Sequence, residues 1–566
     1  MKALWTVYLL IFSLITFAQD NKSPEYPEVM RKYQAIDSMF EEGKMITYGK
    51  TDCGEALHLF VISQTRIFDP SRLHELKKCI LFINNGIHPG EPDGIDASIK
   101  LATDLLTKPL YRRLLENTVV CIVPVFNIDG ALERSCCSRV NQNGPEEYGF
   151  RGNAKNLDLN RDFMKADSKN TFSMMQMIRQ WDPDVFIDTH VSDGADYQYS
   201  MTLISSQHNK MNSEMGKYMK DKLTPELMNK MKEKNDEMVS YVNLEGNNEI
   251  PDSGITAFLE TPRYMCGYTS LFNTFSFIAE SHMLKPFPRR VDATFNLLTS
   301  LIEVCDEQGN KILELRSLAE ESDKKEKYFK FNWTLDTSKK ELINFNGYAA
   351  EQKKSNVTGG MRLYYDKAKP YKKKIPFYDT YLPSDSVIIP RLFIIPQAFY
   401  SAIKLMEINN VKMVRVQDDS STIANVTYIE NYKTIKDPFE GHYFHYDVTT
   451  RNEEQKINIR KGDYLIYLPQ KNYKFILEAL IPRAVDSYFC SGYFDSILQQ
   501  KEWFSSYVFE DLAEKLLQKD QTLKLKFEKW KSDHPEADEY SQLNFIYKSS
   551  DYFEKTYMRY PIYSIY

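Results

Sequence analysis

The chain has 566 residues, with 72 Lys and Arg against 78 Asp and Glu, a formal net charge of −6. This balance lacks the basic footprint of nucleic-acid-binding proteins, so we expect no nucleic-acid partner. Hydrophobic residues make up 42% and charged residues 27% of the chain, which excludes a largely disordered protein. The length is too great for one compact core, so we expect two or three domains.

The first 18 residues have the layout of a secretory signal peptide. Lys2 supplies the positive charge, residues 3–17 are apolar, and residues 16–18 (Thr-Phe-Ala) place small side chains where a signal peptidase cuts. The apolar run is shorter than the ~20 residues of a membrane-spanning helix. The first cysteine is Cys53, so no lipid-anchoring cysteine follows the cleavage point. We therefore expect an exported protein, periplasmic or extracellular, with no stable membrane insertion after signal removal.

Between residues 25 and 320, strand-like apolar runs alternate with helix-like segments. The strand candidates are residues 57–62, 79–83, 119–125, 185–188, 201–205 and 275–279. The helix candidates are residues 93–106, 172–180, 210–223 and 293–304. This alternation predicts an α/β domain over 25–320, with a mixed, mostly parallel sheet sandwiched by helices.

The pattern changes after the charged run 320–327, which is either a linker or a solvated helix end. Short strand-like runs at residues 328–333, 388–395 and 464–468 predict a β-rich accessory module over 326–475. Helical periodicity then returns and predicts a helical or mixed C-terminal segment over 476–566. Its apolar stripe is expected to be a packed core face and consists of Phe504, Val508, Leu512 and Leu516.

A histidine and a glutamate lie three positions apart in the loop that follows the apolar run 79–83. Zinc accepts imidazole nitrogen and carboxylate oxygen, and a catalytic zinc keeps three protein ligands and one open position. His88 and Glu91 supply two such ligands, and His190, at the end of the apolar run 184–189, supplies the third. In open α/β sheets, ligands bind beyond the carboxyl ends of the strands, where all three residues fall. The sequence therefore predicts one zinc ion per chain.

The segment 156–163 (Asn-Leu-Asp-Leu-Asn-Arg-Asp-Phe) lies between these ligands in the chain. With it, the order His-x-x-Glu, Asn-Arg, strand-terminal His and strand-terminal Glu resembles the M14 family of zinc metallocarboxypeptidases. The resemblance covers residues 25–320, and the remainder looks like the extra region of some exported bacterial members. It implies a zinc peptidase whose partners are peptides with a free C-terminus.

The resemblance also implies roles for three polar residues. Asn160 and Arg161 match the pair that holds the substrate's C-terminal carboxylate, a task that suits the bidentate guanidinium. Arg151 matches the arginine that polarises the scissile carbonyl. Arg139 is a competing candidate, and we prefer Arg151 because its distance to the Asn-Arg pair matches short-loop family members.

Glu280, at the end of the strand-like run 275–279, matches the catalytic glutamate of the family. It would act as general base toward a zinc-activated water. Glu260 is the rival, but its strand-like run is shorter. The tyrosine that contacts the substrate could be either Tyr264 or Tyr268.

Three further histidines and one aspartate have simpler interpretations. His282 is interpreted as structural, and His442 and His445 as surface histidines of a β-module rather than an accessory metal pair. Asp188 is the nearest candidate, by sequence, for a carboxylate that supports a ligand histidine.

The resemblance therefore favours a zinc metallocarboxypeptidase that hydrolyses C-terminal peptide bonds. The alternative is a zinc amidase or deacylase on the same scaffold, acting on cell-wall peptides or acylated amino acids. A third class, a binding protein on a dead peptidase scaffold, would require loss of a ligand or of the base, and every expected residue type is present. The oligomeric state, the preferred C-terminal residue and the role of the region after Lys325 stay open at this point.

Overall fold

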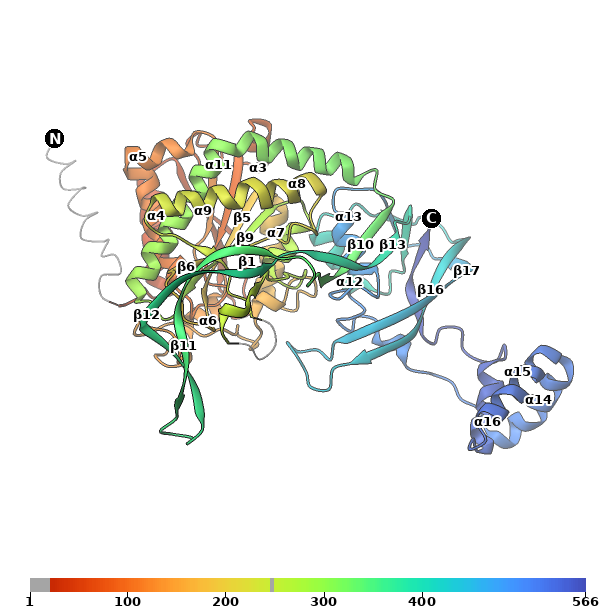
Figure 1. The fold of residues 1–566 in the computed structure, drawn as a ribbon. Helices are drawn as coiled ribbons and strands as arrows, with labels where there is room; N and C mark the ends of the chain where they lie inside the picture. Colours follow the sequence, from red (N-terminus) through yellow and green to blue (C-terminus); the bar gives the residue numbers. More distant parts are fainter. Residues whose placement is uncertain (1–20, 245–248) are drawn as a thin grey trace.

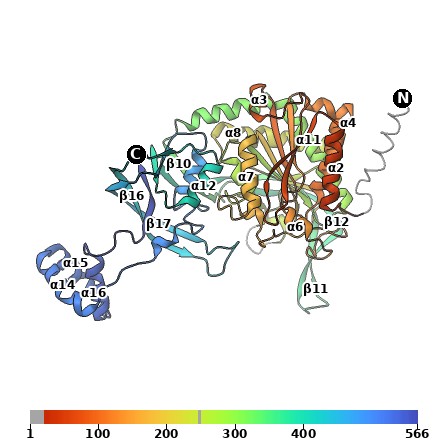
Figure 2. The same cartoon turned by 180° about the vertical axis from the view of Figure 1, so that it is seen from behind.

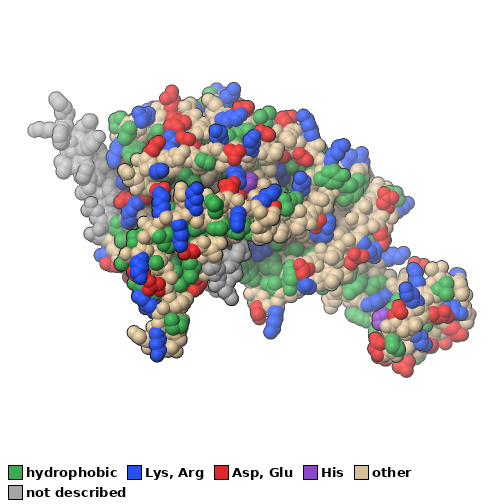
Figure 3. Space-filling view, in the orientation of Figure 1, with side chains coloured by type: hydrophobic (Ala, Val, Ile, Leu, Met, Phe, Trp, Pro, Cys, Tyr) green, Lys and Arg blue, Asp and Glu red, His purple; other side chains and the backbone are tan. Residues whose placement is uncertain are grey.

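The computed structural model describes residues 21–244 and 249–566. The expected signal peptide therefore lies outside the described residues. An α/β body occupies the N-terminal half, β-sheets follow it, and a small helical lobe stands apart near the C-terminus (Figure 1). On the face shown in Figure 3, acidic and basic side chains are interspersed, in keeping with the nearly balanced charge of the chain.

An eight-stranded mixed sheet forms the centre of the α/β body, in the order β1-β2-β4-β3-β5-β9-β6-β7. Its strands are β1 (Gly43–Lys50), β2 (Ala56–Ile62), β3 (Cys79–Asn84), β4 (Thr118–Val123), β5 (Val185–Ser192), β6 (Met201–Ser205), β7 (Val239–Ser240) and β9 (Phe275–His282). The central strands β4, β3, β5 and β9 are parallel to one another. Strands β3, β4 and β5 are buried along their whole length, as expected when helices cover both faces of a parallel sheet.

Helices cover both faces of this sheet. Helices α8 and α9 lie toward the viewer in Figure 1, and α7 lies toward the viewer in the reverse view of Figure 2. The helices of the body are α2 (Tyr26–Met39), α3 (Pro70–Glu75), α4 (Asp93–Thr107), α5 (Pro109–Arg112), α6 (Ile128–Leu132), α7 (Lys169–Trp181), α8 (Ser213–Tyr218), α9 (Thr224–Glu233), α10 (Met265–Ser270) and α11 (Phe287–Asp323). The predicted α/β architecture is confirmed.

Two predicted boundaries differ from the structure. The helix expected over residues 210–223 begins only at Ser213, because Asn212 caps it by accepting the backbone N–H of Glu214. Residues 219–223 then form a short π-helical segment that leads directly into α9. The helix expected over residues 293–304 is longer than predicted, because α11 runs from Phe287 to Asp323, and the charged run 320–327 is therefore a helix end, one of its two predicted interpretations.

Three further sheets contain the C-terminal strands, as the β-rich prediction requires. Strand β10 (Tyr328–Leu335) pairs with β13 (Tyr381–Ile388), and β11 (Glu341–Lys354) pairs with β12 (Met361–Tyr378), which also pairs with β8 (Ile255–Thr256) of the body. A six-stranded sheet contains β15 (Val414–Arg415), β18 (Tyr464–Tyr467), β14 (Leu392–Ile395), β19 (Arg559–Ile565), β16 (Ser420–Thr434) and β17 (His445–Ile459). Strand β19, at the end of the chain, lies inside this last sheet. Segments that are far apart in sequence thus share one module.

The helical lobe consists of α14 (Ser506–Lys519), α15 (Gln521–Asp533) and α16 (Glu539–Lys548). Helices α12 (Tyr400–Ile408) and α13 (Tyr473–Leu480) lie outside this lobe. The predicted core stripe is wrong at Val508, which is 59% exposed. The buried face of α14 passes through Phe509 and Ala513 instead, which pack against α15 and α16. Within the described residues, no helix is both long and apolar enough to cross a membrane.

Candidate active site

Three side chains at the carboxyl edge of the sheet converge on one point. His88 and Glu91 lie in the loop after β3, and His190 lies on β5. The two histidine Nδ1 atoms are 3.2 Å apart, and the Glu91 carboxylate lies 3.3 Å from His88 Nδ1 and 3.1 Å from His190 Nδ1. All three residues are buried, and together they could hold one metal ion.

A close approach of α4 to β5 brings the loop and the strand together. A Cβ placed on Gly94, in the first turn of α4, would lie 1.9 Å from Thr189 Oγ1. A larger residue would therefore push the helix, and the loop before it, away from the strand that carries His190.

Each ligand histidine has its second ring nitrogen bound to a carboxylate. His88 Nε2 lies 2.9 Å from Asp158 Oδ1, and His190 Nε2 lies 2.9 Å from Asp188 Oδ2. A carboxylate accepts a hydrogen bond, so each ring carries a proton on Nε2 and, when it is neutral, a lone pair on Nδ1. The two Nδ1 atoms face each other beside the anionic Glu91, so the site stabilises a proton or a metal ion placed between them. The donor set, two imidazole nitrogens and one carboxylate, fits zinc.

The charges around the site agree with this interpretation. Burial alone would raise the pKa of Glu91, but Arg139, His88 and His190 outweigh it and hold this pKa well below its usual range. Burial lowers the pKa of His190, yet Asp188 and Glu91 raise it well above the usual value. The pocket therefore stabilises positive charge strongly, and a metal that binds there would displace a proton.

Glu280 lies beside the three ligands. It is the register partner of His190 on the adjacent parallel strand β9, so both side chains project from the same face of the sheet. Within β9, Glu280 alone is not fully buried. Burial raises the pKa of Glu280 to about 8, with His190 opposing the shift and Glu91 adding to it.

The rival carboxylate, Glu260, is committed to other contacts. It is completely buried, and its Oε1 accepts hydrogen bonds from the backbone of Gln207 at 3.0 Å and from Lys210 Nζ at 3.0 Å. Its Oε2 has no hydrogen-bond partner among the described residues, but Glu260 is completely buried and paired with Lys210, whereas Glu280 is partly exposed beside a ligand histidine.

Both candidate arginines reach Glu91. Arg139 Nη1 lies 2.7 Å from Glu91 Oε1, whereas Arg151 Nη1 lies 3.4 Å from the same oxygen and Arg151 Nε donates to Asp158 at 2.9 Å. The Arg151 side chain is 42% exposed and that of Arg139 is 20% exposed. Arg151 is therefore the more accessible guanidinium, while Arg139 is the closer partner of Glu91.

The Asn-Arg pair lies in a short 3-10 turn, Leu159–Arg161, that Asp158 caps by accepting the backbone N–H of Asn160 at 2.9 Å. Asn160 Oδ1 accepts the backbone N–H of Met265 at 3.0 Å, so the amide nitrogen is the group suited to a carboxylate. In the part of the chain that the structure describes, no carboxylate forms an ion pair with Arg161.

The structure separates the two candidate tyrosines. The Arg161 guanidinium lies 4.3 Å from the ring centre of Tyr264, next to the Asn-Arg pair. Tyr268 is completely buried, and its hydroxyl donates to Asn409 at 2.5 Å. Tyr268 therefore cannot reach a substrate.

The remaining histidines have other partners. His282 is buried, bound to Asp196 at 3.0 Å and stacked on Tyr197. His442 and His445 bind separate aspartates, Asp167 and Asp495, so they do not form a metal pair. The predicted supporting carboxylate, Asp188, is confirmed as the partner of His190.

Sequence reasoning missed the contact between Asp158 and His88. The only signal for this contact in the sequence is the position of Asp158, two residues before Asn160.

Comparisons with known proteins agree with this site. Residues 33–251 match the family model for zinc carboxypeptidases, Peptidase M14. Carboxypeptidase 2 of Trichophyton tonsurans is 22% identical over 492 residues, covering 81% of this chain and 80% of the relative. Carboxypeptidase 2 of Trichophyton rubrum is 21% identical and covers 74% of each chain.

Two solved structures show more distant similarity. A metallo-carboxypeptidase from Burkholderia cenocepacia is 16% identical and matches 50% of this chain and 69% of its own, with a TM-score of 0.38. Carboxypeptidase A from Helicoverpa armigera is 14% identical and matches 52% and 74%, also with a TM-score of 0.38.

The matched segment contains the His-Glu-His group, both candidate arginines and the Asn-Arg pair, whereas Glu280 lies beyond it. Two imidazole nitrogens and one carboxylate are a donor set that zinc accepts, and the family match covers all three residues. The match over residues 33–251 and the carboxypeptidase relatives together support an M14 zinc carboxypeptidase, and the chain is a zinc metallopeptidase.

Proposed function

We propose that the enzyme removes residues from the C-termini of peptides, with Glu280 as general base. One observation carries the proposal: His88, Glu91 and His190 converge with their ligand atoms facing one another, and Glu280 is the register partner of His190. Zinc held by these three residues would supply the Lewis acidity that activates water and polarises the scissile carbonyl.

Side chains of the protein carry out the proton transfers and stabilise the developing charge. Glu280 takes a proton from the attacking water and delivers it to the leaving amine. A nearby divalent cation would lower its raised pKa toward the range in which a carboxylate exchanges protons at neutral pH. Arg151 stabilises the negative charge that develops on the carbonyl oxygen, where one such donor is typically worth about 3 kcal/mol.

Asn160 and Arg161 hold the substrate's terminal carboxylate in this proposal. The partly exposed side chain of Arg161 and its lack of an ion-pair partner among the described residues support the assignment. Tyr264 would then lie against the terminal residue, because its ring stacks on the Arg161 guanidinium.

An apolar cluster adjoins Glu280, and we propose that it receives the terminal side chain of the substrate. Ile278 precedes Glu280 by two residues on β9 and so shares its face of the sheet. The cluster around it consists of Ile204, Cys266, Tyr241 and Phe258. Because none of these side chains carries a charge, we propose a preference for apolar C-terminal residues.

An amidase or deacylase on the same scaffold is the alternative, since any substrate with a carboxylate next to the scissile amide would use Asn160 and Arg161. We also propose that the protein is exported, on the strength of the first 18 residues.

The test compares peptides with free and amidated C-termini, for wild type and Arg161→Ala. We expect hydrolysis of free peptides only, and a KM at least tenfold higher in Arg161→Ala because a charged hydrogen bond is lost. Activity that survives amidation of the peptide would favour the amidase alternative.

A further inference from the structure

A turn from the C-terminal module reaches the active-site region. Strands β16 and β17 form an antiparallel hairpin. In the segment that connects them, Phe439 and His442 pair across a two-residue turn. The two central residues, Glu440 and Gly441, have φ values of +48° and +80°. We call residues 439–442 the hairpin tip.

Glu440 is an unfavourable residue for its place in the tip. Turns with positive φ at both central positions favour Asn-Gly or Asp-Gly, because asparagine, aspartate and glycine tolerate left-handed backbone. Gly441 suits its position, whereas a glutamate at positive φ carries a conformational cost. Its carboxylate also approaches that of Asp158, at an electrostatic cost. Glu440 therefore occupies this position at a conformational and an electrostatic cost.

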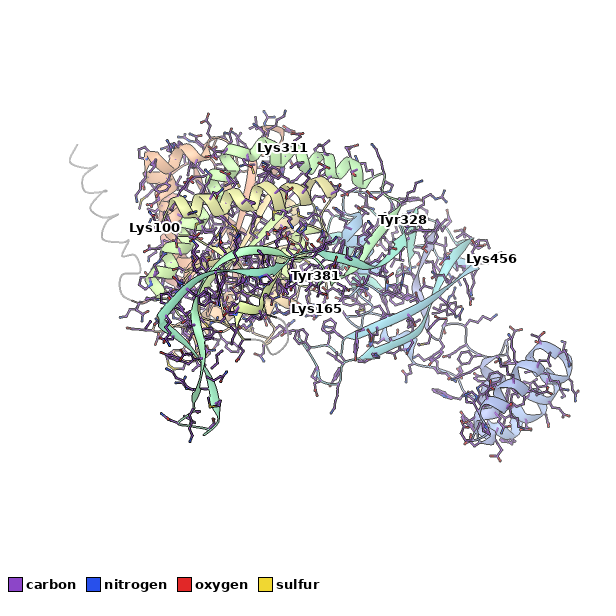
Figure 4. All side chains as sticks on the ribbon, viewed as in Figure 1. Lys100, Lys165, Lys311, Tyr328, Tyr381 and Lys456 are labelled. Carbon is purple, nitrogen blue, oxygen red and sulfur yellow. A yellow bond between two sulfur atoms is a disulfide. The ribbon has the colours of Figure 1, made fainter. Side chains whose placement is uncertain are left out.

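Two contacts fix the tip to the α/β body. Glu440 Oε2 accepts the backbone N–H of Asp158 at 2.7 Å. His442 Nε2 lies 2.6 Å from Asp167 Oδ2, and Lys165, labelled in Figure 4 near the tip, binds the same oxygen at 2.6 Å. The tip thus binds the body on both sides of the Asn-Arg pair.

Asp158 is the residue through which Glu440 can act. Its carboxylate binds His88 Nε2, Arg151 Nε and the backbone N–H of Asn160, each at 2.9 Å. The backbone of Asp158 sets where that carboxylate lies. A shift of this backbone would therefore displace a proposed metal ligand, a proposed oxyanion donor and the carboxylate-binding pair together.

We propose that Glu440 is a positioning residue for the active site, and that the C-terminal module completes the catalytic centre through it. The inference rests on the proposed roles of His88, Arg151 and Asn160. The region after Lys325 would then hold the backbone of Asp158 in position from outside the α/β body.

The test separates positioning from folding by the choice of substitution. Glu440→Gly removes the carboxylate and suits the positive φ, so the turn should fold at least as well. Glu440→Gln keeps an oxygen acceptor. Glu454→Ala, an exposed glutamate on β17, is the matched control.

We expect Glu440→Gly to lower kcat/KM and zinc affinity about tenfold each, with an unchanged or higher Tm. Glu440→Gln and Glu454→Ala should stay within about threefold of wild type, because the acceptor oxygen or the whole contact is retained. Should Glu440→Gly fail to fold, Glu440→Asn replaces it, since asparagine also suits positive φ and is one methylene shorter.

The inference would be overturned if Glu440→Gly kept the kcat/KM and the zinc affinity of wild type. It would also be overturned if Glu440→Gln lost as much kcat/KM and zinc affinity as Glu440→Gly. Zinc affinity, measured by competition with a chelator, reports the position of His88 without turnover. If the wild type cleaves no peptide, the proposed function fails while the zinc measurement still tests Glu440.

Discussion

Replacing Asp188 by asparagine should invert the hydrogen bonding behind His190. Asp188 accepts twice: from His190 Nε2 at 2.9 Å and from Asn84 Nδ2 at 2.8 Å. An asparagine at 188 has one acceptor and one donor, and it keeps the bond from His190 only if Asn84 turns its amide to offer Oδ1, which has no partner among the described residues. If its amide nitrogen faces His190, the ring must carry its proton on Nδ1, the atom that a metal needs unprotonated.

The site is too closed for water to repair this change, because Asp188 is 1% exposed and Asn84 is fully buried. Loss of a carboxylate behind a ligand histidine typically costs 10- to 100-fold in metal affinity, about 1.4–2.7 kcal/mol. We therefore expect Asp188→Asn to bind zinc at least tenfold more weakly than wild type, with a parallel loss of activity at limiting zinc.

The control is the exchange variant, which combines Asn84→Asp with Asp188→Asn. The aspartate introduced at position 84 would accept from the amide nitrogen of the new asparagine, which turns the amide oxygen toward His190 and restores the Nε2 proton. The exchange also conserves charge, so zinc affinity should return to within about tenfold of wild type. The assay is chelator competition on wild type, Asp188→Asn and the exchange variant. Equal affinity in wild type and Asp188→Asn, or no recovery in the exchange variant, would refute the reasoning.

Three other predictions use different parts of the structure. Arg151→Met should lower kcat about a hundredfold, whereas Arg139→Met should mainly weaken zinc binding through Glu91; steady-state kinetics and chelator competition that gave the reverse pattern would exchange these roles. Peptides ending in leucine or phenylalanine should be cleaved faster than those ending in lysine or glutamate, and a preference for a charged residue would contradict the apolar pocket. Burial raises the pKa of Glu478 to about 8, with the charge of Asp486 adding to the shift. The folded state therefore holds a proton that the unfolded state releases, and wild type should lose stability relative to Glu478→Gln between pH 5 and pH 8, on the order of a few kcal/mol in urea titrations; parallel pH profiles would contradict it.

The metal ligands were predictable because each lies at or just beyond the end of an apolar run in the sequence. His190 and Asp188 alternate on one strand, so their shared face follows from the period of two. His88 and Glu91 lie in one loop. The sheet edge then brings these local features together, as the rule for open α/β sheets requires.

Contacts between segments that are far apart in the chain could not be predicted from the sequence in this way. The hydrogen bond from Asp158 to Glu440 joins residues 282 positions apart, and it depends on how a β-hairpin docks on the body. Arg139 and Arg151 both reach Glu91 because their loop folds back on itself, a path that residue spacing does not determine. The buried face of α14 was misassigned at Val508 because that face is set by packing against α15 and α16, which the spacing of apolar residues in one helix does not determine.

The central claim is that one zinc ion and Glu280 act together on peptide C-termini. Its most direct test is zinc content per chain together with hydrolysis of peptides with free C-termini, for wild type and Glu280→Gln. We predict one zinc per chain in both proteins and a loss of at least a hundredfold in kcat for the variant. A chain without zinc, or a fully active Glu280→Gln enzyme, would contradict the account.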